Sequence, residues 1–158
     1  YERFINFINA IEDYNVDEIN KFRDKIIGFG LGLTPSMDDF LAGLMISMYY
    51  AIGYFKLDFK KLQYINNEII KDISGKTTLI SETMLKYASK GKCNEDLRNF
   101  MISLFSPCDE TTFIENIISV INFGETSGTD ILCGVYVGFN IVHNQSQEVV
   151  QNGSQCSS

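Results

Sequence analysis

The feature that most constrains this sequence is a nine-residue pattern that occurs twice. Residues 36–44 read Ser-Met-Asp-Asp-Phe-Leu-Ala-Gly-Leu, and residues 127–135 read Ser-Gly-Thr-Asp-Ile-Leu-Cys-Gly-Val. Both segments have the form Ser-x-x-Asp-apolar-Leu-x-Gly-apolar, follow a glycine-containing break and open the two most apolar helical stretches. We therefore predict two helices that begin at or just before these serines and pack closely through Gly43 and Gly134.

Apolar residues recur at helical spacing through most of the chain, and strand-like alternation is short and confined to residues 56–59. The uncharged stretch 40–55 is shorter than the roughly 20 residues that a membrane-spanning helix needs, and it contains glycine and serine. We predict an all-α fold, a compact bundle of about seven to eight helices with two central apolar helices. Residues 1–143 are expected to form a single helical domain, and residues 144–158, rich in Gln, Ser, Asn and Gly, a disordered tail.

Charge and composition narrow the classes of function. The formal net charge is -7 and Lys and Arg are scattered, which argues against binding to nucleic acid or to an anionic membrane surface. The four cysteines show no C-x-x-C spacing, and the one histidine lies far from them, which argues against a zinc site or a disulfide framework. No signal peptide is visible at the start of the sequence. We predict a cytoplasmic protein.

The repeated helix starts have two interpretations. Ser-x-x-Asp is close to a capping box, a purely structural device that stabilises a helix by about 1 kcal/mol. Alternatively, the free N–H groups of a helix start, approached through glycines and flanked by hydroxyls, form a site for a phosphate or carboxylate. The candidate substrate-binding residues are Gly30, Gly32, Thr34, Ser36, Thr126, Ser127 and Gly128, together with Lys76 and Thr77 at the start of another helix.

Three aspartates in the repeat complicate an anion site, because carboxylates repel an anion. Asp38, Asp39 and Asp130 are candidate ligands of Mg²⁺, and they are also candidate acceptors for a substrate amide or amine. Asp39 and Asp130 occupy the same position in the two copies, whereas the counterpart of Asp38 is Thr129. We therefore take Asp39 and Asp130 as the candidate catalytic pair and expect them to matter more than Asp38.

Three segments together resemble the bacterial AllH family. They are Gly-Leu-Gly-Leu-Thr-Pro-Ser-Met-Asp-Asp-Phe-Leu-Ala-Gly at 30–43, Thr-Thr-x-x-Ser at 77–81 and Gly-x-Thr-Ser-Gly-x-Asp-x-Leu-x-Gly at 124–134. The resemblance spans roughly residues 28–139, and Met37 stands where the family usually has glycine. Family members are longer, so the resemblance implies that this chain corresponds to their C-terminal part.

The AllH family is associated with oxamate carbamoyltransferase in anaerobic allantoin degradation. The resemblance implies a carbamoyltransferase subunit that binds a small anion such as carbamoyl phosphate or oxamate, with other subunits of the enzyme or further copies of itself as partners. Two alternatives stay open: a non-catalytic binding or assembly module, and a magnesium-dependent hydrolase that uses Asp38, Asp39 and Asp130. The expected cofactor is Mg²⁺ if the three aspartates act together, and none otherwise.

Overall fold

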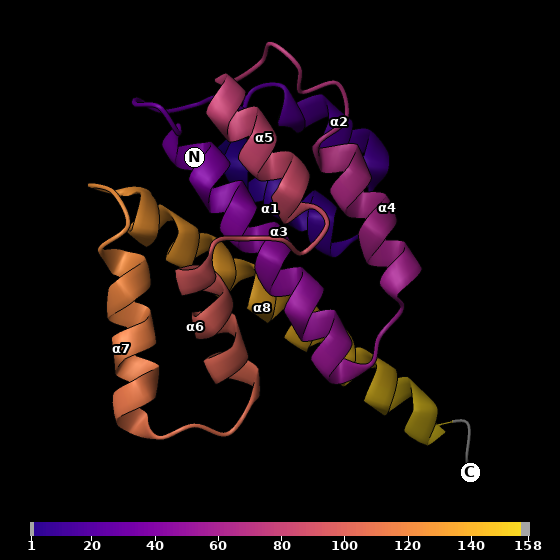
Figure 1. Cartoon of the computed structure of the whole chain (residues 1–158). Helices are drawn as coiled ribbons and strands as arrows, with labels where there is room; N and C mark the ends of the chain where they lie inside the picture. The colour runs from indigo at the N-terminus through magenta and orange to yellow at the C-terminus, as the bar shows by residue number, and fades with distance from the viewer. Residues whose placement is uncertain (1, 156–158) are drawn as a thin grey trace.

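The computed structural model describes residues 2–155, and this part of the chain contains eight α-helices and no strand (Figure 1). The helices are α1 (Glu2–Glu12), α2 (Val16–Arg23), α3 (Ser36–Phe55), α4 (Phe59–Ile69), α5 (Leu79–Ala88), α6 (Glu95–Phe105), α7 (Glu110–Ile121) and α8 (Ser127–Gln155). The prediction of an all-α fold with about seven to eight helices is confirmed.

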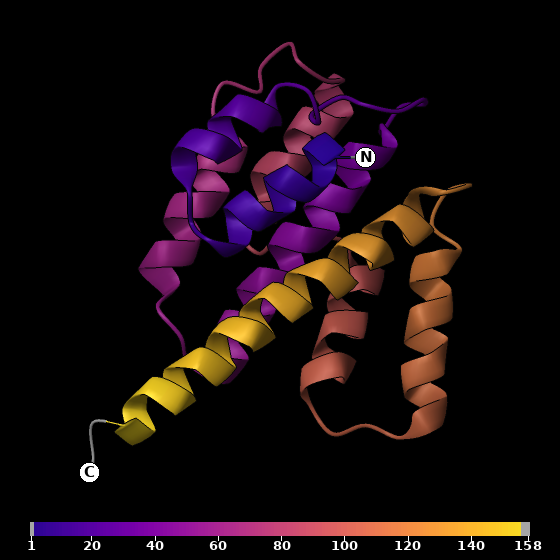
Figure 2. The same ribbon diagram turned by 180° about the vertical axis from the view of Figure 1, so that it is seen from behind.

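Helices α3 and α8 cross at the centre of the molecule, and Figure 2 shows α8 running diagonally across the fold. Their backbones touch where the repeat places glycine. A Cβ atom on Gly43 would lie 2.0 Å from the carbonyl oxygen of Ile131, and a Cβ atom on Gly134 would lie 2.0 Å from the carbonyl oxygen of Phe40. No side chain fits at either position, so the predicted packing of the two helices through these glycines is confirmed.

Helix α3 supplies more of the buried core than any other helix. All residues from 38 to 48 are buried, including two aspartates and Ser47, whose hydroxyl donates to the carbonyl of Val135 on α8 at 2.8 Å. Figures 1 and 2 show α1, α2, α4 and α5 on one side of the α3–α8 pair and the α6–α7 hairpin on the other. Within residues 2–155, no helix combines the length and the apolar character needed to span a bilayer.

Three outer helices begin at residues whose side chains cap them. The side chains of Thr78, Asn94 and Asp109 accept hydrogen bonds from the third residue of α5, α6 and α7, respectively. Each bond satisfies a backbone N–H group that has no partner within its own helix. These local signals fix where the outer helices start, and hence where the loops between them lie.

The end of α8 differs from the prediction. The sequence analysis ends this helix near residue 143 and expects disorder from 144 onward, but the helix continues to Gln155. The reason is a tertiary contact, because Gln145 accepts from the Tyr14 hydroxyl at 2.7 Å and donates to the Glu12 carbonyl at 3.1 Å. Ser146 is also buried. Residues 156–158 of the expected tail lie outside the described residues.

The two glycines of α3 provide a direct test of the α3–α8 contact. We expect Gly43→Ala to lower the free energy of unfolding by about 3 kcal/mol, because the new methyl group would push the two backbones apart. Gly53→Ala is the matched control, since nothing lies within 4 Å of its would-be Cβ atom. That change should instead stabilise the helix by about 0.5–1 kcal/mol. Urea denaturation followed by circular dichroism measures both, and equal effects would contradict the close contact.

Candidate functional site

The starts of α3 and α8 meet through a chain of hydroxyl groups. Thr34, just before α3, donates to Asp39 Oδ2 at 3.0 Å, and its oxygen lies 3.1 Å from the hydroxyl oxygen of Ser127. Either hydroxyl can be the donor in the second contact. This Ser127–Thr34–Asp39 chain joins the two copies of the repeat at their first turns.

The carboxyl group of Asp39 is buried at this junction, and half of it is unsatisfied. Its side chain is 0% exposed, and Oδ1 has no hydrogen-bond partner among the described residues. Burial is the main reason why the pKa of Asp39 is raised, with smaller contributions from the charges of Asp130 and Asp38. The hydroxyl groups of Ser127 and Thr34 beside the carboxyl lower the pKa of Asp39 and so act in the opposite direction.

Asp130, the counterpart of Asp39 in α8, is in a similar position. It is half-buried, and within the described part of the chain its Oδ2 atom is buried without a partner. Its charge raises the pKa of Asp39, which places the two carboxyl groups in the same local environment. The structure therefore brings together the two aspartates that the sequence analysis selects as the candidate catalytic pair.

Asp38 has a different role, which the sequence analysis underestimates. Its Oδ1 atom accepts from the backbone N–H of Gly28 at 2.8 Å, and its Oδ2 atom accepts from the Thr77 hydroxyl. Asp38 is fully buried, and both of its carboxylate oxygens have a hydrogen-bond partner inside the protein. Asp38 thus ties the glycine loop before α3, and the loop before α5, to the first turn of α3.

The capping-box interpretation of the first repeat is wrong. The residue that precedes α3 is Pro35, which makes no side-chain cap, so Ser36 is already inside the helix. Asp39 bonds to the Thr34 hydroxyl instead of reaching back to a backbone N–H. Its side chain is therefore committed to the junction with α8 and not to the end of its own helix.

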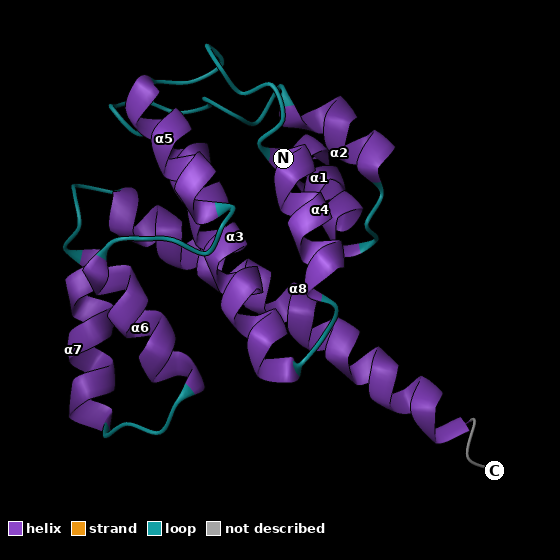
Figure 3. Ribbon diagram, turned by 45° about the vertical axis from the view of Figure 1, so that its right-hand side comes forward, coloured by secondary structure: helices purple, strands orange, loops and turns teal. Residues whose placement is uncertain are grey.

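The loops before α3 and α5 run close together at one end of the molecule, where Figure 3 shows several connecting segments gathered. The Thr78 hydroxyl donates to the carbonyl of Leu33 at 2.6 Å and accepts from the N–H of Ser81. Ser81 is fully buried, and its own hydroxyl has no partner among residues 2–155. All three segments that carry the family resemblance therefore contain a buried, unpartnered side-chain oxygen, on Asp39, Ser81 and Asp130.

Several residues predicted to bind substrate have structural partners instead. Lys76 forms an ion pair with Asp24 at 2.8 Å, and it holds the pKa of that carboxyl below its usual range together with Arg23. Thr77 donates to Asp38. A Cβ atom on Gly128 would lie 1.9 Å from the carbonyl oxygen of Val120. These residues position the loops and helices, and the structure does not bring them into the Ser127–Thr34–Asp39 chain.

The remaining predicted residues line the edges of the junction. Gly30 lies against the backbone of Ser36, where a Cβ atom would be 2.5 Å from the Ser36 nitrogen. Gly32 and Thr126 are exposed, and Ser36 is half-buried. Some helix-start amides are already in use, since Met37 N–H donates to the Phe29 carbonyl and Gly128 N–H to the Phe123 carbonyl. An anion at this end would meet fewer free N–H groups than the sequence suggests.

The three aspartates have different partners. Among the described residues, no group of three or more His, Cys, Asp or Glu side chains is arranged to hold a metal ion. Asp38 faces Gly28 and Thr77, whereas Asp39 faces Thr34. The magnesium interpretation requires the three carboxylates to converge, and their hydrogen bonds separate Asp38 from the other two.

Cavities flank the junction on two sides. One of about 230 Å³ has Thr34 and Ile131 in its otherwise mainly apolar wall, and an open one of about 580 Å³ has Asp130 and Thr129 in its wall. Thr34 and Asp130 therefore each line a space beside the junction.

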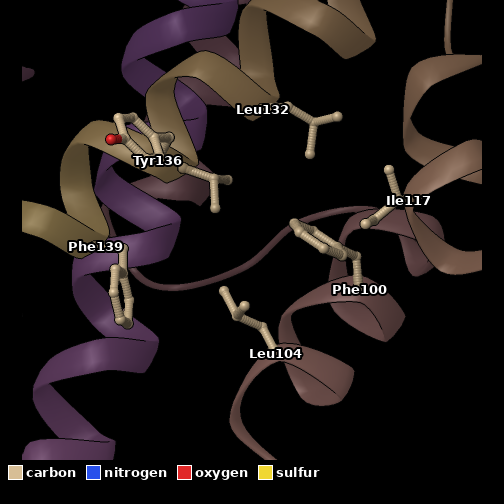
Figure 4. Close-up of a pocket in the computed structure, with 7 residues that line it drawn as sticks. Phe100, Leu104, Ile117, Leu132, Tyr136 and Phe139 are labelled. Atoms are coloured by element: carbon tan, nitrogen blue, oxygen red, sulfur yellow. The ribbon is translucent and has the colours of Figure 1, made fainter. Parts of the chain in front are cut away.

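A third cavity, of about 250 Å³, lies between α8 and the α6–α7 hairpin (Figure 4). Its wall is apolar, with Phe100 and Leu104 from α6, Ile117 from α7 and Phe139 from α8. Figure 4 shows the Tyr136 hydroxyl pointing away from this space. The cavity offers no polar partner for a small charged or amide substrate, so the helix junction is the better candidate site.

Comparison with known families identifies the family to which the chain belongs. The sequence profile of the family described as oxamate carbamoyltransferase subunit AllH matches residues 26–139, which is more than half of the chain. The chain belongs to the AllH family. The match contains α3, α5 and the first half of α8, and so all of the AllH residues that build the junction. No solved structure matches the chain.

Asp38 should be the aspartate on which the stability of this AllH chain depends most. We expect Asp38→Ala to lower the free energy of unfolding by about 2–4 kcal/mol, because Gly28 and Thr77 both lose an acceptor inside the protein. Asp130→Ala is the comparison, since one oxygen of Asp130 already lacks a partner. Thermal and urea denaturation measure the effect, and a smaller loss for Asp38→Ala than for Asp130→Ala would contradict this assignment.

The raised pKa of buried Asp39 should make the free energy of unfolding depend on pH. Because its pKa is raised on folding, the folded state holds the proton more tightly than the unfolded chain. Its carboxyl therefore destabilises the fold increasingly as pH rises from the ordinary aspartate range through the raised pKa. We expect Asp39→Asn to match the wild type in acid and to be more stable by about 1 kcal/mol at pH 7.

Glu125→Gln is the control for this titration, because it removes the same charge from an exposed position beside the junction. Urea denaturation of the two variants and the wild type gives the difference curves between about pH 3, which is below the ordinary pKa of an aspartate, and about pH 8, which is well above it. A constant difference between Asp39→Asn and wild type across this range would show that the pKa of Asp39 is not raised.

Proposed function

We propose that this chain is a subunit of an oxamate carbamoyltransferase-type enzyme and binds the small substrate, carbamoyl phosphate or oxamate, at the junction of α3 and α8. The observation that carries the proposal is the Ser127–Thr34–Asp39 chain, which gathers two hydroxyls and a buried, half-satisfied carboxyl from both copies of the repeat. A polar group left without a partner inside a protein is costly, and such groups concentrate at functional sites.

The hydroxyls of Thr34 and Ser127 are suited to the oxygen atoms of the substrate. In the structure the two hydroxyls bond to each other, and Thr34 also bonds to Asp39. When a ligand binds, the Ser127–Thr34 bond would be replaced by bonds to the carboxylate or phosphate oxygens of the ligand. Carbamoyl transfer builds negative charge on the carbonyl oxygen, and pre-positioned donors stabilise that charge. Asp39 and Asp130 remain the candidate catalytic residues, and a carboxyl with a raised pKa exchanges protons closer to neutral pH than an exposed one.

A role in assembly is the second candidate, and exposed apolar side chains favour it. Leu31, Leu33 and Leu79 are 94%, 74% and 79% exposed, and the hydrogen bond from Thr78 to Leu33 brings their two loops together. Exposed apolar patches of this kind mark contacts between proteins. The family description names a subunit, so we propose that these loops contact another subunit of the enzyme and bring it to the substrate site.

Isothermal titration calorimetry with carbamoyl phosphate, oxamate and inorganic phosphate tests the substrate proposal. We expect at least one carbamoyl compound to bind at millimolar concentration or tighter, and Thr34→Val to weaken that binding about 10-fold, as expected for a lost hydrogen bond of roughly 1.4 kcal/mol. Thr83→Val is the control, because the exposed Thr83 hydroxyl bonds only within α5. A folded protein that binds none of these compounds would contradict the proposal.

A further inference from the structure

The two free carboxylate oxygens at the α3–α8 junction indicate which part of a substrate fits there. Oδ1 of Asp39 and Oδ2 of Asp130 are buried and lack partners among the described residues, while the other oxygen of Asp39 is held by Thr34. Asp39 is completely buried and lies where the two helix starts meet. Each free oxygen is an acceptor that a donor must satisfy.

Phosphate and carboxylate oxygens are poor partners for these two atoms. They are acceptors as well, and they carry the same sign of charge as an ionised aspartate, so contact would be repulsive. Among the described residues, the charges that act on Asp39 are those of Asp130 and Asp38, and Lys76 is paired with Asp24. The anionic end of a ligand therefore fits the hydroxyls and helix-start amides, and a neutral donor group fits the carboxylates.

We propose that the α3–α8 junction recognises its substrate by a primary amide or carbamoyl –NH₂ group, which donates hydrogen bonds to the free oxygens of Asp39 and Asp130. An –NH₂ group carries two donors, which matches two acceptors supplied by equivalent positions of the repeat. This inference rests on the proposed function, which places the substrate at the junction, and adds the orientation of that substrate: nitrogen toward the carboxylates, anionic end toward Thr34 and Ser127.

In this orientation, both copies of the repeat contribute residues that contact the substrate. Each copy contributes one carboxylate, and the hydroxyl of Ser127 reaches Thr34 across the gap between the copies. The carboxylates also lie where a proton leaves or joins the substrate nitrogen when a carbamoyl group is moved from or to it. Asp38 takes no part, because Gly28 and Thr77 occupy both of its oxygens.

Pairs of ligands that differ only by –NH₂ against –CH₃ test the inference. Oxamate and pyruvate form one pair, and carbamoyl phosphate and acetyl phosphate form the other. Titration calorimetry of the whole chain should show binding of the –NH₂ member about 10-fold or more tighter than its –CH₃ partner, because the methyl group leaves both acceptors unpaired. Equal binding within each pair would overturn the inference and leave the proposed function intact, whereas no binding of any of the four would overturn both.

Variants of Asp39 and Asp130 test whether these two residues cause the preference for the –NH₂ ligand. Asp39→Asn places an –NH₂ donor where an acceptor is needed, so we expect the preference for oxamate over pyruvate to fall to about 2-fold or less, as for a contact worth little free energy. Asp130→Asn should act in the same direction. Glu125→Gln removes one charge beside the junction without touching the carboxyl pair, and it should keep the full preference. An unchanged preference in both aspartate variants would overturn the inference.

Discussion

The contact between the backbones of α3 and α8 is the constraint on which the other features depend. Gly43 and Gly134 leave no room for a side chain between the helices, so the first turns of both helices lie within hydrogen-bond reach of each other. This proximity closes the gap between Ser127 and Thr34 and carries Asp39 into the interior. The outer helices complete the burial, but the distance between the two helix starts is set by the glycines.

The same contact buries the carboxyl group of Asp39, and the fold stabilises the ionised form of that group only in part. Burial and the neighbouring charges disfavour the ionised form of Asp39, and the hydroxyl chain satisfies one of its two oxygens. A purely structural polar group would be expected to have all its bonds made, as Asp38 has. The oxygens without a partner on Asp39 and Asp130 are the ones that the proposed substrate would satisfy.

The sequence predicted those features that local patterns determine. The repeat predicted the pairing of α3 with α8 through Gly43 and Gly134. The sequence could not predict the partners of Asp38. Gly28 and Thr77 lie 10 and 39 residues away from Asp38 along the chain, and only the folding of two loops brings them to it. The length of α8 was missed for the same reason, because a polar composition resembles a tail unless its contacts with α1 are known.

A crystal structure of the protein soaked with oxamate tests the central claim most directly. The account predicts oxamate at the junction of α3 and α8, with its amide nitrogen about 2.9 Å from Asp39 Oδ1, a normal hydrogen-bond distance, and its carboxylate beside Thr34 and Ser127. Oxamate bound there in the reverse orientation, with its nitrogen in solvent and its carboxylate against the aspartates, would contradict the account. So would oxamate bound elsewhere with the junction unchanged.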